Sequence, residues 1–143
     1  MARIKLSPPD KFFFSADIPI RITDINYGGH VGNDTFLSLI HEARIKFLAR
    51  YSLTELDFGG TSLIMSDISI EYKKELFYGD CLKVYINVIE LTRAGFELFY
   101  KMVKNQEETI VAFAKSGMVC YDYASKKIVA VPQNIRLQFQ EQL

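Results

Sequence analysis

The pattern of apolar and polar positions along the chain changes period twice. From residue 12 to residue 22 apolar side chains occupy alternate positions, which is typical of a half-buried β-strand. Pro19 lies in this stretch and lacks a backbone donor, so it favours a bulge or the edge of a sheet. From Asp34 to about Tyr51 apolar residues recur every three or four positions, which predicts an amphipathic helix. The predicted apolar stripe consists of Phe36, Ile40, Ala43, Phe47 and Tyr51.

The predicted helix also carries apolar residues outside that stripe. Leu37, Leu39 and Leu48 add apolar surface, so we expect the helix to be covered on more than one side, as when a sheet wraps around it. Asn33 or Asp34 is expected to cap the start of the helix, because a side-chain oxygen there accepts hydrogen bonds from the first-turn N–H groups.

Beyond the glycine pair at residues 59–60 the chain predicts strands separated by short turns. Gly117 predicts a bulge or a close backbone contact. The tail beyond Pro132 fits either a short strand or a final helical turn. The predicted strands cover residues 62–72, 82–88, 96–102 and 109–123. One face of the first of them is expected to hold Ile64, Ile68, Ile70 and Tyr72.

This order of elements predicts a single α+β domain over residues 1–143, with a core of about 12–123 and a tail at 132–143. One strand, one long helix and four antiparallel strands make a five-stranded sheet. A single helix covers only one face of such a sheet, so the other face needs a partner or polar side chains. A homodimer that continues the sheet would protect both that face and the free edge strand.

Composition narrows the functional class. Lys plus Arg equals Asp plus Glu at 17 each, which argues against a nucleic-acid-binding protein. The N-terminus does not read as a signal peptide and no stretch has about 18 consecutive apolar residues, so we expect a cytoplasmic protein without a membrane segment. Cys81 and Cys120 lie in alternating segments and are expected to be buried free thiols. With two cysteines and two histidines, we expect no metal site.

Three short motifs occur in register along this pattern. The first reads Asp-Ile-Asn-Tyr-Gly-Gly-His-Val-Gly-Asn over residues 24–33, the second Glu-Ala-Arg over residues 42–44. The third is Ile-Glu-Tyr at 70–72, followed by Phe-Tyr-Gly-Asp at 77–80. Together they resemble the 4-hydroxybenzoyl-CoA thioesterase-like family of the hot-dog fold, whose first motif reads Asp-x-Asp-x-x-Gly-His-Val-Asn-Asn. The resemblance covers residues 12–123.

The resemblance implies an antiparallel sheet wrapped around a central helix, and hydrolysis of an acyl-CoA or related thioester in a cleft shared by two subunits. It implies a homodimer or tetramer, and no cofactor besides the coenzyme A of the substrate. In the family a carboxylate assists the reaction and N–H groups at the start of the helix polarise the thioester carbonyl. The second role also follows from the residues, because a helix N-terminus presents unpaired donors and partial positive charge. Gly28 and Gly29 would let a substrate approach the backbone closely.

The chain departs from the family at Asn26, where the pattern has its second Asp. An amide binds water or donates to a carbonyl, but it has no useful basicity near neutral pH. Glu42 is the first candidate to replace the carboxylate, and Asp24 or Asp34 are the others. Alternatively, the chain binds acyl thioesters without hydrolysing them. An acyl-thioester hydratase on a related scaffold fits the motifs less well.

The candidate site therefore centres on the first motif. Asp24 either takes part in the reaction or braces the turn, and His30 either contacts the thioester or bonds a backbone carbonyl. The predicted catalytic set is Asp24, Asn26, His30 and Glu42. The predicted substrate-binding set is Tyr27, Gly28, Gly29, Val31, Asn33 and Asp34.

Four further positions have structural or functional interpretations. His41 is expected to be a packed or interface residue, and Arg44 to make structural contacts across subunits. Asp67 is a secondary candidate for a carboxylate in the cleft, although solvent exposure is the simpler expectation. Lys73 and Lys74 form either a solvated face or a contact to the phosphates of coenzyme A.

Overall fold

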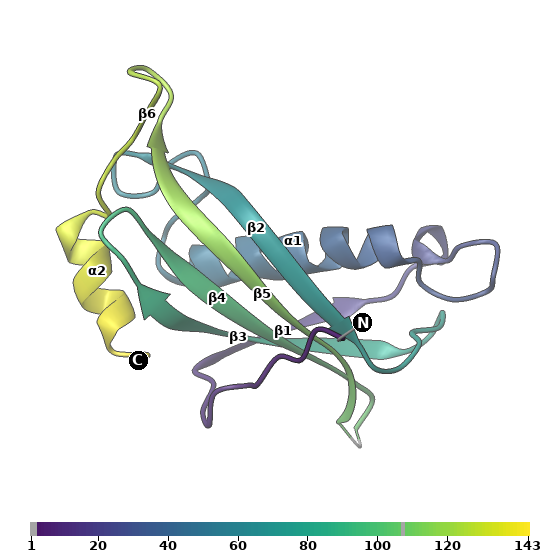
Figure 1. Ribbon diagram of the computed structural model, residues 1–143. Helices are drawn as coiled ribbons and strands as arrows, with labels where there is room; N and C mark the ends of the chain where they lie inside the picture. Colours follow the sequence, from purple (N-terminus) through teal and green to yellow (C-terminus); the bar gives the residue numbers. More distant parts are fainter. Residues whose placement is uncertain (1–2, 107) are drawn as a thin grey trace.

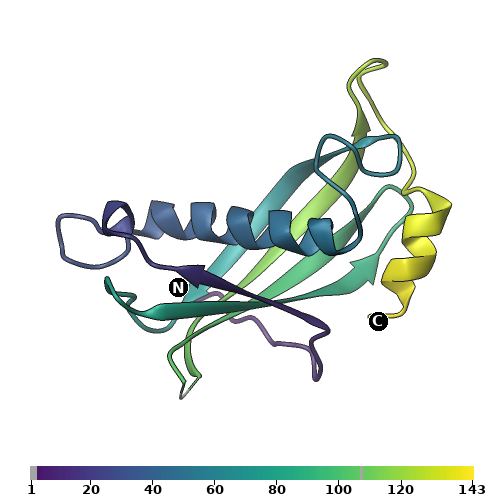
Figure 2. The same ribbon diagram turned by 180° about the vertical axis from the view of Figure 1, so that it is seen from behind.

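One long helix lies across one face of a six-stranded antiparallel sheet in the computed structural model, which describes residues 3–106 and 108–143 (Figure 1). Figure 2 shows the helix in front of the sheet, running obliquely to the strands. In chain order the elements are β1 (Phe14–Pro19), the 3₁₀ helix η1 (Ile22–Asp24), α1 (Asn33–Arg50), β2 (Ser62–Tyr72), β3 (Cys81–Leu91), β4 (Gly95–Lys104), β5 (Thr109–Asp122), β6 (Lys127–Ile128) and α2 (Gln133–Gln140).

The sheet has the order β1-β3-β4-β5-β2, and the short β6 pairs with the end of β5. The predicted α+β class and the five long antiparallel strands are confirmed, and β6 is an addition. In the described part of the chain β2 pairs with β5 alone, so its other edge is free. The expected homodimer across this edge stays a prediction.

The core lies between α1 and the sheet. The helix buries Phe36, Ile40, Ala43 and Phe47 of the predicted stripe, while Leu37 on one side of it is 43% exposed. Alternate residues of the two central strands pack against this face of the helix and are buried. They alternate because successive side chains of a β-strand point to opposite faces of the sheet. These residues are Leu82, Val84, Ile86 and Val88 of β3 and Phe96, Leu98, Tyr100 and Met102 of β4.

The helix starts in a different way from the prediction. Gly32 is the N-cap, with an extended backbone (φ −72°, ψ 156°), and no side chain caps the helix. Its carbonyl accepts the N–H groups of Thr35 and Phe36. The expectation that Asn33 or Asp34 would cap the helix is therefore wrong, because both residues already belong to the first turn. The first-turn N–H groups are not consumed by a side-chain cap.

A bulge in β2 changes which residues face the helix. The register shifts between Met65 and Asp67, opposite Gly117 of β5. Ile68 packs against the core, but Ile64, on the other side of the bulge, does not. The expectation that they share a face is wrong, because the extra residue reverses the alternation. The predicted close contact at Gly117 is confirmed: its N–H donates to Asp67 Oδ1 at 3.0 Å, and a Cβ would lie 2.7 Å from that oxygen.

The face of the sheet opposite α1 is covered partly by the chain itself. Residues 3–13 cross this face before β1 begins (Figure 1). Phe12 packs against Phe99 with 6.3 Å between ring centroids, and Phe99 is only 2% exposed. The N–H of Leu6 donates to Glu71 Oε1 at 2.9 Å, which fixes the segment beside β2. A partner subunit is therefore not required to bury the centre of this face.

The C-terminal tail resolves as helix rather than strand. Helix α2 places Phe139 against Phe96, Phe47 and Phe58, with ring centroids 5.1, 5.9 and 6.1 Å apart. Phe139 is fully buried, so α2 closes the end of the core beyond the C-terminus of α1 (Figure 2).

The two cysteines differ. Cys120 is buried, as predicted, and its burial raises the pKa of the thiol to about 11. Cys81 is exposed, so that part of the prediction is wrong. The reason is its position at the start of β3, where Leu82 takes the inward direction and Cys81 points outward.

Candidate active site

The first motif forms a closed loop between η1 and α1. An isolated antiparallel bridge between Ile25 and Val31 joins its two ends. Asn26 organises the interior: its N–H donates to the His30 carbonyl at 2.8 Å, and its side-chain Oδ1 accepts the N–H of Gly28 at 2.8 Å. The loop is therefore held in one shape by the residue that replaces the family carboxylate.

The Asn26 amide lies beside the start of α1. Because Oδ1 accepts the Gly28 N–H, the amide nitrogen is turned toward Gly32. A Cβ at Gly32 would lie 3.4 Å from Asn26 Nδ2 and 2.7 Å from Asp34 Oδ1. An amide donor, a carboxylate and the free N–H groups of a helix N-terminus thus converge on a position that only glycine leaves open.

A cavity of about 250 Å³ lies next to the motif loop, between the first turn of α1 and the end of β2. The Tyr72 hydroxyl donates to the Asn33 carbonyl at 3.1 Å, which joins β2 to the first turn of the helix. Burial, with a smaller contribution from the charge of Asp34, raises the pKa of the Tyr72 phenol. The cavity is lined by His30, Val31, Asn33, Phe36, Tyr72, Lys73, Lys74 and Glu75.

A larger cavity of about 700 Å³ lies toward the opposite edge of the sheet, beside β1, β3 and the turn between β4 and β5. It shares no residue with the motif loop, and its walls are mainly apolar. The smaller cavity is the candidate site, because it is the one that adjoins the motif loop and the start of α1.

Two of the predicted catalytic residues make structural contacts. Asp24 is buried, and its Oδ2 accepts the N–H of Arg21 at 2.8 Å, so it braces η1. The His30 ring places Nδ1 3.1 Å from the Val31 carbonyl, in line with the structural interpretation, while the residue also lines the cavity. Tyr27 is fully exposed at the loop and does not line the cavity.

The other carboxylates are distributed unevenly. Asp34 lies beside Gly32 at the start of α1, although it does not line the cavity. Glu42 is exposed two turns further along α1, roughly 12 Å away at 1.5 Å per residue, so one chain does not bring it to the loop. Asp67 is exposed as expected, and its carboxylate is engaged by Gly117.

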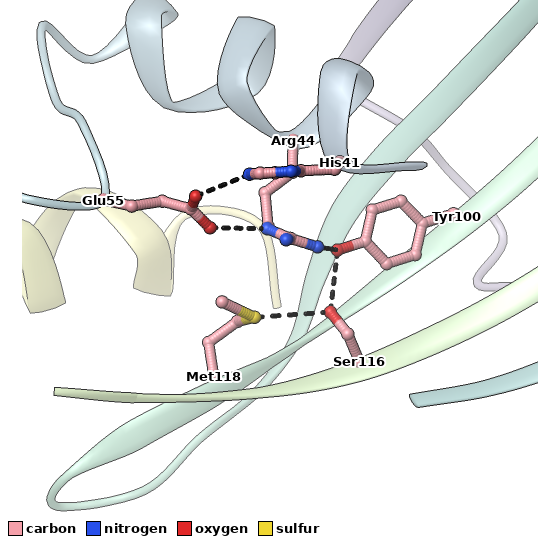
Figure 3. Close-up of polar contacts among 6 residues, drawn as sticks. All are labelled: His41, Arg44, Glu55, Tyr100, Ser116 and Met118. Atoms are coloured by element: carbon pink, nitrogen blue, oxygen red, sulfur yellow. Dashed lines mark hydrogen bonds and ion pairs between the residues drawn. The ribbon is translucent and has the colours of Figure 1, made fainter. Parts of the chain in front are cut away.

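A buried polar cluster lies between α1 and the sheet, and sequence reasoning missed most of it (Figure 3). Arg44 is 5% exposed; its Nε donates to Glu55 Oε2 at 3.0 Å and its Nη1 to the Tyr100 hydroxyl at 3.2 Å. Tyr100 in turn bonds Ser116 at 2.7 Å. These contacts lie within one chain and confirm a structural role for Arg44, while contacts of Arg44 across subunits stay a prediction. Arg44 lies one turn after Ile40, in line with the predicted apolar stripe. A cation at such a position needs a buried partner, and this was the signal of the cluster in the sequence.

His41 extends this cluster toward solvent. Its Nε2 lies 2.7 Å from Glu55 Oε1, and its side chain is 54% exposed, so it is not packed in the core. Burial opposes ionisation of Glu55, but the hydrogen bonds from His41 and Arg44 outweigh it and lower the pKa of that carboxyl.

Across residues 3–106 and 108–143, no group of three or more His, Cys, Asp and Glu side chains is placed to hold a metal ion. Neither helix of this part of the chain has the length and apolar character needed to cross a membrane.

The chain is similar to known proteins over most of its length. A family model described as the thioesterase-like superfamily matches residues 20–139. The chain is 28% identical over 120 residues to a 1,4-dihydroxy-2-naphthoyl-CoA hydrolase of Microcystis aeruginosa, covering 82% of this chain and 86% of that protein. Among solved structures it is similar to a 1,4-dihydroxy-2-naphthoyl-CoA thioesterase from Synechocystis (TM-score 0.81, 21% identity, 90% and 96% of the two chains). It is also similar to a Thermus thermophilus thioesterase complexed with coenzyme A and Zn (TM-score 0.80, 20% identity, 94% and 97%).

Proposed function

Because the chain belongs to the thioesterase-like superfamily, and is in that sense a thioester hydrolase, we propose that it hydrolyses acyl-CoA thioesters at the start of α1. The observation that carries this proposal is the uncapped first turn of α1, where the Asn26 amide lies beside Gly32 and the next residue, Asn33, lines a cavity. The thioester carbonyl oxygen would accept hydrogen bonds from the first-turn N–H groups, and Asn26 Nδ2 supplies a further donor. Such donors stabilise the oxyanion that forms when water attacks.

A coenzyme A substrate is supported by a cluster of cations next to the cavity. A further cavity, of about 330 Å³, lies next to the 250 Å³ cavity at the start of α1, and the two share Tyr72 and Lys73. The 330 Å³ cavity is lined by Arg3, Lys5, Glu71, Tyr72 and Lys73. The N–H of Leu6 and the ammonium of Lys73 lower the pKa of the Glu71 carboxyl, which anchors the N-terminal segment there. The remaining positive charge suits the phosphates of a coenzyme A.

The proposal includes a homodimer formed through the free edge of β2. That edge offers unpaired backbone groups to a second copy, and a continued sheet would bring the two cavities next to the partner. It also includes a cytoplasmic location, in keeping with two cysteines that form no disulfide.

A hydrolysis panel tests the function. Purified protein is given acyl-CoA substrates with aryl, medium-chain and long-chain acyl groups, and release of free thiol is followed with a chromogenic disulfide. We expect hydrolysis of at least one substrate well above the rate without protein. Background rates across the whole panel would contradict the proposal.

A second candidate, a module that binds acyl thioesters without hydrolysing them, is favoured by the amide at Asn26. An Asn26→Asp variant that gains hydrolysis from an inert parent would support it. An active parent removes it. Binding of a non-hydrolysable acyl-CoA analogue, measured by calorimetry, separates an inert binder from a protein that does not bind the substrate class at all.

A further inference from the structure

A histidine–carboxylate pair joins α1 to the loop that follows it, outside the motif loop (Figure 3). Glu55, from the loop between α1 and β2, uses one oxygen for His41 Nε2 at 2.7 Å and the other for Arg44 Nε at 3.0 Å. The carboxylate is 24% exposed, whereas the imidazole is 54% exposed. The pair therefore has a buried, fixed end and an open end.

The hydrogen bonds define what the open end offers. The Glu55 carboxylate accepts, so His41 donates Nε2–H and the lone pair of the neutral ring lies on Nδ1. Within the described ranges no partner of that nitrogen is recorded, and the charged groups that meet the pair are those of Arg44. A base held by a carboxylate that is itself held by a third group is the arrangement used to activate a nucleophile.

We propose that His41 is the general base of the thioester hydrolysis, with Glu55 and Arg44 as positioning residues, and that it serves the site of a second copy of this chain. This inference rests on the proposed function. It supplies the proton acceptor that Asn26 cannot be.

The alternative carboxylates are less well placed. Asp34 lies beside Gly32, where its charge opposes the oxyanion that the first-turn N–H groups would stabilise. Glu42 follows His41 by one residue and so points about 100° further round the helix, away from Glu55. Asp24 is committed to Arg21.

The position of His41 requires the second copy. Asn33 and His41 are eight residues apart, which is roughly 12 Å along α1 and too far for one bridging water. Leu37 lies midway between them on the helix and is 43% exposed. A two-fold axis near Leu37, with the free β2 edges paired, would bring His41 of the partner subunit next to Asn33. Each site is then completed by the other chain.

The reaction step balances without a further reactant. His41 Nδ1 takes a proton from water as its oxygen bonds the thioester carbon, and the carbonyl oxygen becomes an oxyanion at the first-turn N–H groups. The C–S bond then breaks, the carbonyl re-forms as a carboxylic acid, and the imidazolium returns its proton to the departing thiolate. The products are the acid and free coenzyme A.

Substitution kinetics test the base. His41→Gln is expected to lower kcat about 10² to 10³-fold with KM within about threefold, and Glu55→Gln to lower kcat about tenfold. Lys46→Gln, an exposed change on the same helix, serves as the control and should retain the parent rate. An acidic limb in the profile of kcat/KM against pH should be present in the parent and absent in His41→Gln. An unchanged rate in His41→Gln, or a loss confined to Asp34→Asn or Glu42→Gln, overturns the proposal.

Mixed dimers test the shared site. His41→Gln and Gly32→Val chains with different tags are refolded together and the doubly tagged dimer is isolated. One of its two sites then combines an intact helix start with an intact His41, so about half the parent activity is expected. A site within one chain gives no recovery and overturns the proposal. Absence of any hydrolysis in the parent would instead contradict the proposed function, which keeps the two failures distinct.

Discussion

At the scale of single residues, the candidate site depends on an amide and a glycine. Asn26 holds the loop with one end of its side chain and faces the helix start with the other. Gly32 has an ordinary backbone angle, so it is required for space rather than for backbone freedom. Gly29 is the opposite case, with φ +84° and open space around it.

These two glycines should respond differently to alanine. In Gly32→Ala the new Cβ displaces the flexible Asp34 side chain and obstructs the helix start, so we expect kcat/KM to fall about tenfold with less than about 1 kcal/mol lost from the free energy of unfolding. Gly29→Ala should cost about 1 kcal/mol through backbone strain. Urea unfolding and acyl-CoA kinetics measure both quantities. Equal stability losses would contradict the distinction.

Glu55 predicts a residue-level dependence of stability on pH. Its pKa is lowered in the folded protein, so its contribution is present above the ordinary glutamate value of about 4.3 and is lost as pH falls through the folded pKa. We expect Glu55→Gln to unfold at lower urea concentration at pH 7, with a loss of roughly 1–3 kcal/mol, and to lose less stability than the parent between pH 5 and 3. Glu42→Gln, an exposed change, is the stability control; a matching loss there would refute the assignment.

At the scale of elements, the N-terminal segment is the part whose role the hydrophobic pattern did not predict. Alternation from residue 12 indicated a strand but said nothing about the polar residues before it. The structure uses them to cross the outer face, with Leu6 bonded to Glu71 and with Arg3 and Lys5 beside Lys73. The N-terminal segment, which is far from β2 in sequence, thereby adds positive charge next to the end of β2.

Removing those charges tests whether the segment contacts the coenzyme. Arg3→Gln/Lys5→Gln should raise KM for acyl-CoA about tenfold at low salt, with kcat unchanged, because phosphate contacts are lost. KM for the matching acyl-pantetheine, which lacks the nucleotide, should not change. Lys126→Gln/Lys127→Gln removes two exposed charges at the β5–β6 turn and controls for net charge. A parallel rise in KM for both substrates would argue against the contact.

At the scale of the whole molecule, periodicity predicted the order of the long elements because burial repeats every second or every three to four residues. It could not predict the β2 bulge, where one extra residue turned Ile64 away from the core. The motif loop was located from its residues. The ion cluster under α1 was not, because Arg44 and Glu55 are joined by tertiary contact, and Tyr100 and Ser116 resemble ordinary strand residues in sequence.

The free β2 edge predicts that the molecule is a dimer in solution. Sedimentation or light scattering at micromolar concentration should give twice the mass of one chain. Leu37→Glu, which introduces charge at an exposed apolar position of α1 where the two-fold axis is proposed, should shift the protein toward monomer and reduce hydrolysis in proportion. A monomeric parent with full activity would contradict this arrangement. Leu137→Glu, on the exposed side of α2, is the matched control.

The path of residues 3–13 also bears on how the protein is handled. Arg3 and Lys5 line the 330 Å³ cavity, so an acidic purification tag or reporter joined close to Arg3 would compete for the same cations. Helix α2 ends at a different part of the surface (Figure 1). A label joined after Leu143 therefore leaves the cavity unencumbered, and immobilisation through that end presents it to a solution of ligand.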